Sequence, residues 1–253
     1  TTLANNQKHE ENGIRLFEIG KIFLPQPPPV IASETKQSPE GKKKLPQEKQ
    51  MLCAALSGPR GELSWHGNED LLDFFDAKGV AEKLLKQSGL KATFEASDDE
   101  SLLPGRSANI ISGGDKIGVV GDLHPRVALA FGFSTSVCLI EMDVEKLLGK
   151  TSRLEKYQPI PRFPSITRDI ALLVDKQITY QQIEDIIRSF PLVVKVTLFD
   201  LYTGEQIPEG RKSFAVRIVY QSPEHTLTTL EVDKIQQQML SRLYHKLGVA
   251  LRG

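Results

Sequence analysis

Two stretches fix the architecture of the last third of this chain: RFPSITRDIALLV at positions 162–174 and FDLYTGEQIPEGRKSFAVRIVYQSPEHTLT at positions 199–228. Within and beside them, RDIALLV (168–174), KVTLFDLY (195–202) and SFAVRIVYQ (213–221) alternate apolar residues with small or polar ones. This period of two is typical of strands that bury one face. We therefore predict three strands in this block.

A predicted helix, TYQQIEDIIRSF at 179–190, separates the first two strands. Thr179 is a suitable N-cap, because its hydroxyl can accept from a free backbone N–H of the first turn. Apolar residues at helical spacing give the helix one face for packing. They are Ile183, Ile186 and Ile187.

A second predicted helix follows the third strand, begins after a cap at Thr228 or Thr229 and ends at Gly248. VALR at 249–252 reads as a last strand. The order strand, helix, strand, strand, helix, strand is the ferredoxin-like arrangement. It places both helices on one face of a four-stranded antiparallel sheet and leaves the other face open.

Alternation along the strands sorts their side chains onto two faces. One set is apolar and is expected to face the helices: Ile170, Leu172, Val174, Phe199, Leu201, Phe214, Val216 and Ile218. The opposite set is small, polar or aromatic: Asp169, Ala171, Asp200, Tyr202, Ser213, Ala215 and Arg217. Small residues let a base approach the sheet, Tyr202 can stack on it, and Asp200 and Ser213 can hydrogen-bond to base edges. The residues alone favour an ordinary solvated face, but they also fit an RNA-binding one.

Five cations near the strands are candidate contacts for phosphate: Arg162, Arg168, Lys195, Arg211 and Lys212. Each is, by itself, more often a plain surface charge. Arg168 could equally form a structural ion pair with its neighbour Asp169.

The N-terminal part has its own pattern. IRLFEIGKIFL at 14–24 predicts a strand, a turn at Gly20-Lys21 and a second strand. Residues 25–50 are rich in Pro, Lys and Gln, and we expect a mobile loop there. MLCAALSG at 51–58 predicts a central strand buried on both faces.

A helix is expected between positions 70 and 90, with Gly89 as its C-terminal signal. Its predicted buried face comprises Leu72, Phe75, Val80, Leu84 and Leu85. The short apolar runs at 93–96, 108–112, 116–123 and 137–144 read as strands, and a helix begins at Pro125. In PGRSA at 104–108, Gly105 and Arg106 could bind an anion, but we favour a structural turn in which Arg106 pins a carboxylate. The expected organisation is an α+β chain with a first domain at 1–150, a linker at 151–163 and the ferredoxin-like domain at 164–253.

Composition excludes several classes of function. Lys+Arg and Asp+Glu are both 32, so the formal net charge is zero. Overall charge therefore gives no indication of nucleic-acid binding, and any RNA must bind a local surface. Cys53 and Cys138 lie far apart in apolar runs, which indicates buried thiols and no zinc site. No apolar run reaches the ~18 residues of a membrane span. The histidines lack partners at metal-ligand or catalytic-triad spacing, so we predict no metal site and no catalytic residue.

Four motifs in the last block stand in order: FPxxxRD from Phe163, FDxYxG from Phe199, PEGxKS from Pro208 and TLT from Thr226. In these motifs the chain resembles the ferredoxin-fold anticodon-binding domain that closes the β subunit of bacterial phenylalanyl-tRNA synthetases.

The first part also resembles that subunit, in its class II synthetase-like module, which copies the catalytic fold without its chemistry. The similar segments are RLFEIGKIF, DFFDAKGVAEKLL, LPGRSANI, GVVGDLHPRV and VCLIEMDV. One departure is Leu103, which stands where the family usually has His.

The resemblance implies a C-terminal fragment of a non-catalytic subunit of a cytoplasmic ligase, with subunit contact and anticodon recognition as its roles. It favours the open face, with Ala171, Asp200, Tyr202, Ser213, Ala215 and Arg217, as the anticodon site. It implies an α subunit in an α2β2 assembly and tRNA for phenylalanine as partners, but neither membrane nor DNA. ATP and Mg²⁺ would serve the whole enzyme, with no cofactor in this fragment. The alternative is a free-standing RNA-binding or assembly module.

Overall fold

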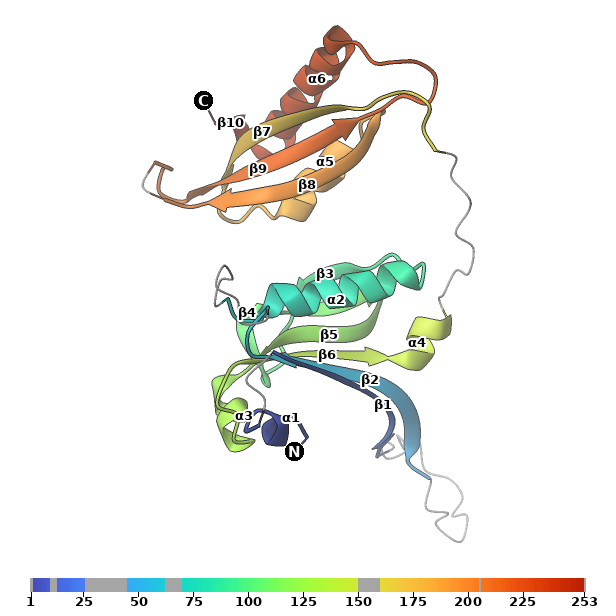
Figure 1. Cartoon of the computed structure of the whole chain (residues 1–253), viewed down its shortest axis with the longest axis vertical. Helices are drawn as coiled ribbons and strands as arrows, with labels where there is room; N and C mark the ends of the chain where they lie inside the picture. Colours follow the sequence, from blue (N-terminus) through green and yellow to red (C-terminus); the bar gives the residue numbers. More distant parts are fainter. Residues whose placement is uncertain are drawn as a thin grey trace, which may run out of the picture. The chain divides into compact units, whose positions relative to one another are not determined.

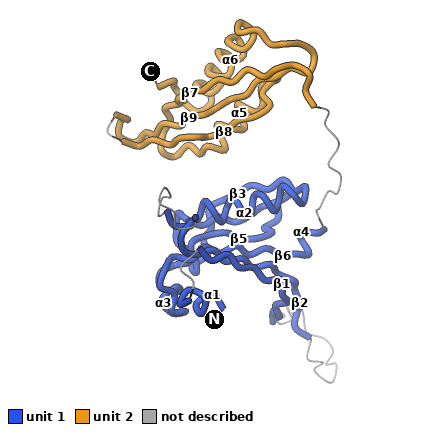
Figure 2. The backbone as a smooth tube through the Cα atoms, in the orientation of Figure 1, with its two compact units in different colours: residues 1–156 blue, residues 157–253 orange. Residues whose placement is uncertain are grey.

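The computed structural model describes residues 2–9, 13–25, 45–61, 70–149, 160–204 and 206–252. The chain divides into two units, unit 1 at residues 1–156 and unit 2 at residues 157–253 (Figures 1 and 2). The division falls within the segment predicted as a linker, 151–163. Residues 151–159 of that segment, and residues 26–44 of the predicted mobile loop at 25–50, lie outside the described residues.

The six elements of unit 2 follow one another as predicted. They are β7 (Ile166–Asp175), α5 (Tyr180–Arg188), β8 (Val193–Tyr202), β9 (Arg211–Tyr220), α6 (Thr229–Leu247) and β10 (Ala250–Leu251). The described strands form an antiparallel sheet in the order β10-β7-β9-β8, and both helices pack on one face of it (Figure 1). The ferredoxin-like prediction is therefore confirmed, together with the open face.

Local sequence sets the ends of both helices. Thr179 and Thr228 each form a capping box, in which the threonine accepts from the third helical residue and that residue's side chain accepts from the cap backbone. Thr228, and not Thr229, is the cap of α6. Gly248 ends α6 in the left-handed conformation, with φ of 65°, which glycine adopts without a Cβ clash.

The core of unit 2 fills the space between the sheet and the helices. Residues from β7 and β9 meet residues from α5 and α6 in one apolar cluster. The largest of its fully buried members are Leu172, Ile183, Ile187, Ile218, Tyr220, Met239 and Leu243. Burying each such side chain contributes about 1.5–3 kcal/mol, so this cluster holds the helices on one face.

A bulge in β8 overturns one prediction. Leu198 pairs with Val216 and Asp200 pairs with Ala215, so Phe199 is an extra residue in the ladder. Phe199 was predicted to face the helices, but it is 53 % exposed and lies against Arg217 on the open face. Leu201 pairs with the core residue Phe214, yet it is half exposed because the core cluster does not extend to it.

Unit 1 is a second α+β unit with an antiparallel sheet, as predicted. Its elements are α1 (Thr2–Asn6), β1 (Ile14–Leu24), β2 (Gln47–Ser57), α2 (Phe74–Gln87), β3 (Thr93–Ala96), β4 (Leu102–Ser112), β5 (Asp115–Leu123), α3 (Pro125–Ala130), β6 (Val137–Asp143) and α4 (Val144–Gly149). The described strands pair in the order β1-β2-β6-β5-β4-β3 (Figure 1). The apolar core lies between α2 and the strands β5 and β6.

Three predictions for the hairpin of β1 and β2 were wrong. Gly20 makes no turn, because β1 pairs with β2 over its whole length and Gly20 lies opposite Met51. Residues 47–50, assigned to the loop, belong to β2. The 51–58 segment is next to the edge strand and only partly buried over residues 51–55. Its apolar run lacks the cover that a central strand would have.

The buried face of α2 also differs from the prediction. Leu72 and Leu85 are buried and Leu84 packs against the core, as predicted, whereas Phe75 is 73 % exposed and Val80 is also exposed. The close approach of α2 to the sheet is made instead by the buried Ala77 and Ala81, whose small side chains gave no signal of burial.

The cap of α6 gives a test of local stability. Thr228→Ala removes the acceptor for the backbone N–H of Glu231, so we expect a loss of about 1 kcal/mol in the free energy of unfolding. Thr229→Ala, at the exposed neighbouring position, is the matched control and should change it little. Urea denaturation followed through the NMR signals of unit 2 measures both values. Equal losses would contradict the assignment of Thr228 as the cap.

The same box makes stability depend on pH. Hydrogen bonds from the backbone N–H and hydroxyl of Thr228 lower the pKa of Glu231 from 4.5 to about 2, with His225 adding to the effect. This stabilisation is present above the unfolded pKa of 4.5 and is lost as pH falls through the folded value of about 2. Glu231→Gln should therefore lose less stability than the parent between these two pH values.

Candidate nucleic-acid interface

The open face of unit 2 carries the predicted base-binding residues at neighbouring positions. Ala171 pairs with Ala215, Asp200 also pairs with Ala215, and Tyr202 pairs with Ser213. Paired residues in an antiparallel ladder point to the same face of the sheet. Both helices lie on the other face (Figure 1), so the register gathers these five residues on the uncovered side.

The residues of this face differ in how far they are exposed to solvent. Ala171 and Ala215 are partly exposed and present little bulk, and Asp200 is exposed. The exposed carboxylate of Asp200 can be reached from solvent and can accept hydrogen bonds. Ser213 is only 3 % exposed, and its hydroxyl therefore lies beneath the surface and not at the rim.

Arg217 lies on the same face in a charged pair. Its Nε and Nη2 donate to Asp169 Oδ1 and Oδ2 at 2.8 and 2.7 Å, a bidentate contact. This hydrogen bonding from Arg217 lowers the pKa of Asp169. The guanidinium carbon also lies 5.4 Å from the ring centroid of Phe199. An aromatic ring, a cation and an anion thus occupy one end of the face.

Tyr202 forms a second aromatic–cation contact. The guanidinium carbon of Arg252 lies 4.9 Å from the centre of its ring, and Arg252 Nη2 donates to Gln206 Oε1 at 3.0 Å. Sequence reasoning missed Arg252 and Phe199. Alternation along the last strand could have placed Arg252 on the open face. Ala250 pairs with Leu173 on that face, and residues two apart in a strand point to the same side.

The five predicted phosphate contacts are scattered. Arg162 is exposed before β7, and Lys195 is exposed at the open-face position opposite Val219. Arg211 pairs with Asp175 at 3.3 Å. Arg168 and Lys212 lie on the helix side: Arg168 pairs with Asp233 of α6, and Lys212 Nζ donates to the carbonyl of Lys176 at 2.9 Å. The alternative ion pair of Arg168 with Asp169 was wrong, because each residue pairs elsewhere.

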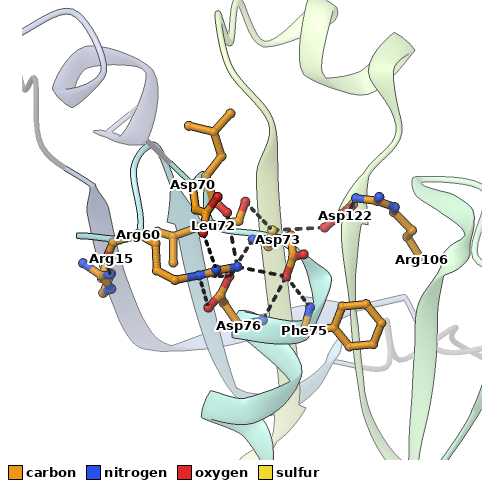
Figure 3. Close-up of polar contacts among 11 residues, drawn as sticks. Arg15, Arg60, Asp70, Leu72, Asp73, Phe75, Asp76, Arg106 and Asp122 are labelled. Carbon is orange, nitrogen blue, oxygen red and sulfur yellow. Dashed lines mark hydrogen bonds and ion pairs between the residues drawn. The ribbon is translucent and has the colours of Figure 1, made fainter. Parts of the chain in front are cut away.

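Unit 1 contains a polar cluster around Arg60 (Figure 3). Arg60 Nη2 lies 3.0 Å from Asp76 Oδ2, and Arg60 Nη1 lies 3.5 Å from Asp70 Oδ2. Asp73 caps α2 through a capping box with Asp76. The cluster therefore fastens the start of α2 to the segment that follows β2, which is a structural task.

A second polar contact in Figure 3 joins the end of β5 to β4 and β6. Arg106 Nη1 donates to Asp122 Oδ2 at 3.3 Å, which confirms that Arg106 pins a carboxylate. The Cys138 thiol donates to Asp122 Oδ1 at 3.0 Å. The pKa of the Cys138 thiol is raised, mainly by burial and further by the contact with Asp122. This thiol is therefore a structural group and not a nucleophile.

Among the described residues, no group of three or more His, Cys, Asp or Glu is placed to hold a metal ion. No helix in the described part of the chain combines the length and apolar character that crossing a bilayer requires.

Comparison with known families agrees with the geometry of both units. Residues 161–252 match the family described as "Ferredoxin-fold anticodon binding domain", which places the chain among proteins that carry this domain. Residues 1–144 match the family described as "Phenylalanyl tRNA synthetase beta chain CLM domain". The chain belongs to the phenylalanyl-tRNA synthetase β-chain family.

Similar curated proteins carry the name phenylalanine–tRNA ligase β subunit. The protein of Dehalococcoides mccartyi is 40 % identical over 99 % of this chain and 29 % of its own length. Those of Halalkalibacterium halodurans and Bacillus licheniformis are 35 % and 37 % identical over 98 % and 100 % of this chain, and each is covered over 30 % of its length. The chain thus spans less than a third of these relatives. A solved pyrrolysyl tRNA synthetase of Desulfitobacterium hafniense is 16 % identical, with a TM-score of 0.38 over 58 % of this chain and 45 % of that one.

The two cysteines should react very differently with a thiol reagent. Cys53 is partly exposed, whereas Cys138 is buried and hydrogen-bonded to Asp122. Burial raises the pKa of both thiols. We expect slow modification of Cys53 at pH 8 and modification of Cys138 only after denaturation. Mass spectrometry of timed samples measures both rates, with Cys53→Ser as the control. Prompt labelling of Cys138 in the folded protein would contradict this environment.

Proposed function

We propose that this chain is part of the β subunit of a phenylalanine–tRNA ligase and that the open face of unit 2 binds the tRNA anticodon. One observation carries the proposal: both helices pack on the same side of the sheet, and the uncovered side brings Ala171, Asp200, Tyr202 and Ala215 together. Sequence in RNA is read from unstacked loop bases, which need an accessible stacking surface with nearby acceptors.

Each residue has a distinct proposed role. Ala171 and Ala215 form a low surface over which a base can lie, and the buried Ser213 lies beside them on the same face. Tyr202 offers a ring for stacking, and Asp200 accepts hydrogen bonds from amino groups of a base edge. Arg217, held by Asp169, contributes a guanidinium at the rim.

For the phosphate backbone we propose Arg162 and Lys195. Both are exposed, and Lys195 lies on the open face. Arg211 is partly neutralised by Asp175, and Arg168 and Lys212 lie on the helix side, which makes these three weaker candidates. A net charge of zero is compatible with binding, because recognition then rests on a local surface.

The whole enzyme is proposed to activate phenylalanine with ATP and Mg²⁺ and to esterify tRNA in the cytoplasm. We assign no catalytic residue to this chain. The chemistry belongs to an α subunit, in an α2β2 assembly, and this chain would supply subunit contact and anticodon recognition.

A surface for the α subunit is proposed along the edge strand β1. Phe17 is 76 % exposed, and Ile19 and Phe23 on the same face of the sheet are also exposed. Edge strands are normally protected by charge or cover, so such an apolar stripe indicates a contact surface.

Substitutions on the open face test anticodon recognition. Tyr202→Ala and Asp200→Ala should each weaken discrimination between wild-type and anticodon-substituted tRNA by roughly 1–3 kcal/mol, because a stacked base or a base-edge hydrogen bond is lost. Tyr244→Ala is the matched control, since Tyr244 is an exposed tyrosine on α6. Aminoacylation by the assembled ligase measures the ratio of kcat/KM for the two tRNAs. An unchanged ratio in both folded variants would place the anticodon elsewhere.

Substitution of the β1 stripe tests subunit contact. Phe17→Ser should weaken binding of the α subunit by roughly 1–3 kcal/mol, since a buried aromatic side chain is lost from the interface. Leu129→Ser, at an exposed position in α3, serves as control. Sedimentation of mixed subunits measures the affinity. A variant that assembles as tightly as the parent would show that the α subunit does not cover β1.

A further inference from the structure

The contact between Arg252 and Tyr202 crosses the whole open face. In the order β10-β7-β9-β8, Tyr202 belongs to one edge strand, and Arg252 follows the strand at the opposite edge. Their side chains nevertheless meet, with the guanidinium carbon 4.9 Å from the ring centroid. The two side chains therefore reach toward each other above β7 and β9.

Arg252 is fixed at two further points. Its backbone N–H donates to the carbonyl of Ala171 at 2.9 Å, which extends the pairing of β10 with β7 by one residue. Its Nη2 donates to Gln206 Oε1 at 3.0 Å, in the loop that follows β8. A backbone anchor at one edge and a side-chain anchor at the other hold the guanidinium over the sheet.

The hydroxyl end of Tyr202 lies close to Gly204. A Cβ added to Gly204 would lie 2.2 Å from Tyr202 Oη and 2.4 Å from Cζ, distances that no side chain tolerates. Gly204 thus leaves room for the ring in this position. Ser213, the pairing partner of Tyr202, is buried although it lies on the open face.

We propose that Arg252 is a positioning residue that holds the Tyr202 ring across the open face as a preformed stacking surface for an unpaired RNA base. This inference rests on the proposed function of the face. A ring already held in place loses little rotamer freedom when a base stacks on it, so the base gains more of the stacking energy. The guanidinium also adds positive charge beside the bound RNA.

A double-mutant cycle in the assembled ligase tests this inference. Arg252→Ala should reduce the ratio of kcat/KM for wild-type over anticodon-substituted tRNA by roughly two- to fivefold, the equivalent of an exposed cation–π contact. The loss should appear in KM for tRNA, since positioning affects binding. In a Tyr202→Ala background, Arg252→Ala should have little further effect on the ratio, because Arg252 acts through that ring.

Two other variants separate positioning from general damage. Gly204→Ala keeps every charge but displaces the Tyr202 ring, so it should lower the ratio in the same direction. Arg242→Ala is the matched control, because Arg242 lies 4.7 Å from the Phe190 ring and bonds Ser189, far from the open face on the helix side. Arg242→Ala should leave the ratio unchanged.

The outcomes distinguish the two proposals. If Tyr202→Ala and Asp200→Ala both leave the ratio unchanged, the anticodon proposal fails and the role of Arg252 with it. If Tyr202→Ala alone leaves the ratio unchanged, the positioning role fails while the anticodon proposal stands. If Tyr202→Ala lowers the ratio but Arg252→Ala does not, the positioning role alone is overturned. If Arg252→Ala lowers the ratio equally with and without the Tyr202 side chain, Arg252 contacts the RNA independently of that ring. Tighter RNA binding by Arg252→Ala would show that the contact between Arg252 and Tyr202 obstructs the open face. Both results contradict positioning.

Discussion

The pairing of β9 between β7 and β8 is the constraint on which unit 2 depends. Because residues paired across an antiparallel ladder share a face, this central strand commits Phe214, Val216 and Ile218 to the helices. The same register commits their neighbours to the opposite face. Core formation and the creation of an open surface are thus one event, since the apolar set cannot be buried without exposing the other.

The bulge in β8 adjusts this division without destroying it. The extra residue, Phe199, leaves the ladder and joins Arg217 on the open face. Asp200 and Tyr202 keep their places opposite Ala215 and Ser213. An insertion without compensation would have moved one half of the strand to the wrong face. The bulge instead adds an aromatic ring to the exposed surface and preserves the core.

Charge is organised locally in a chain that is neutral as a whole. On the open face, Arg217 is tied to Asp169 and Arg252 to Gln206, and each guanidinium also lies over an aromatic ring. Exposed ion pairs contribute little to stability. Their more important effect here is to fix the orientation of planar groups, which matches a surface that would receive planar bases.

Local pattern alone determined most of unit 2: the order of its elements, the cap at Thr179, a second cap at Thr228 or Thr229, the C-terminal Gly248 and the placing of Ala171, Asp200 and Tyr202 on one face. These features depend on periodicity and on contacts within a few residues, which the sequence displays directly. Tertiary structure alone decided the bulge at Phe199, the burial of Ala77 and Ala81 on α2, the continuous strand through Gly20 and the meeting of Tyr202 with Arg252. Each depends on what a distant strand or helix presents at that point, and neighbouring residues carry no record of it.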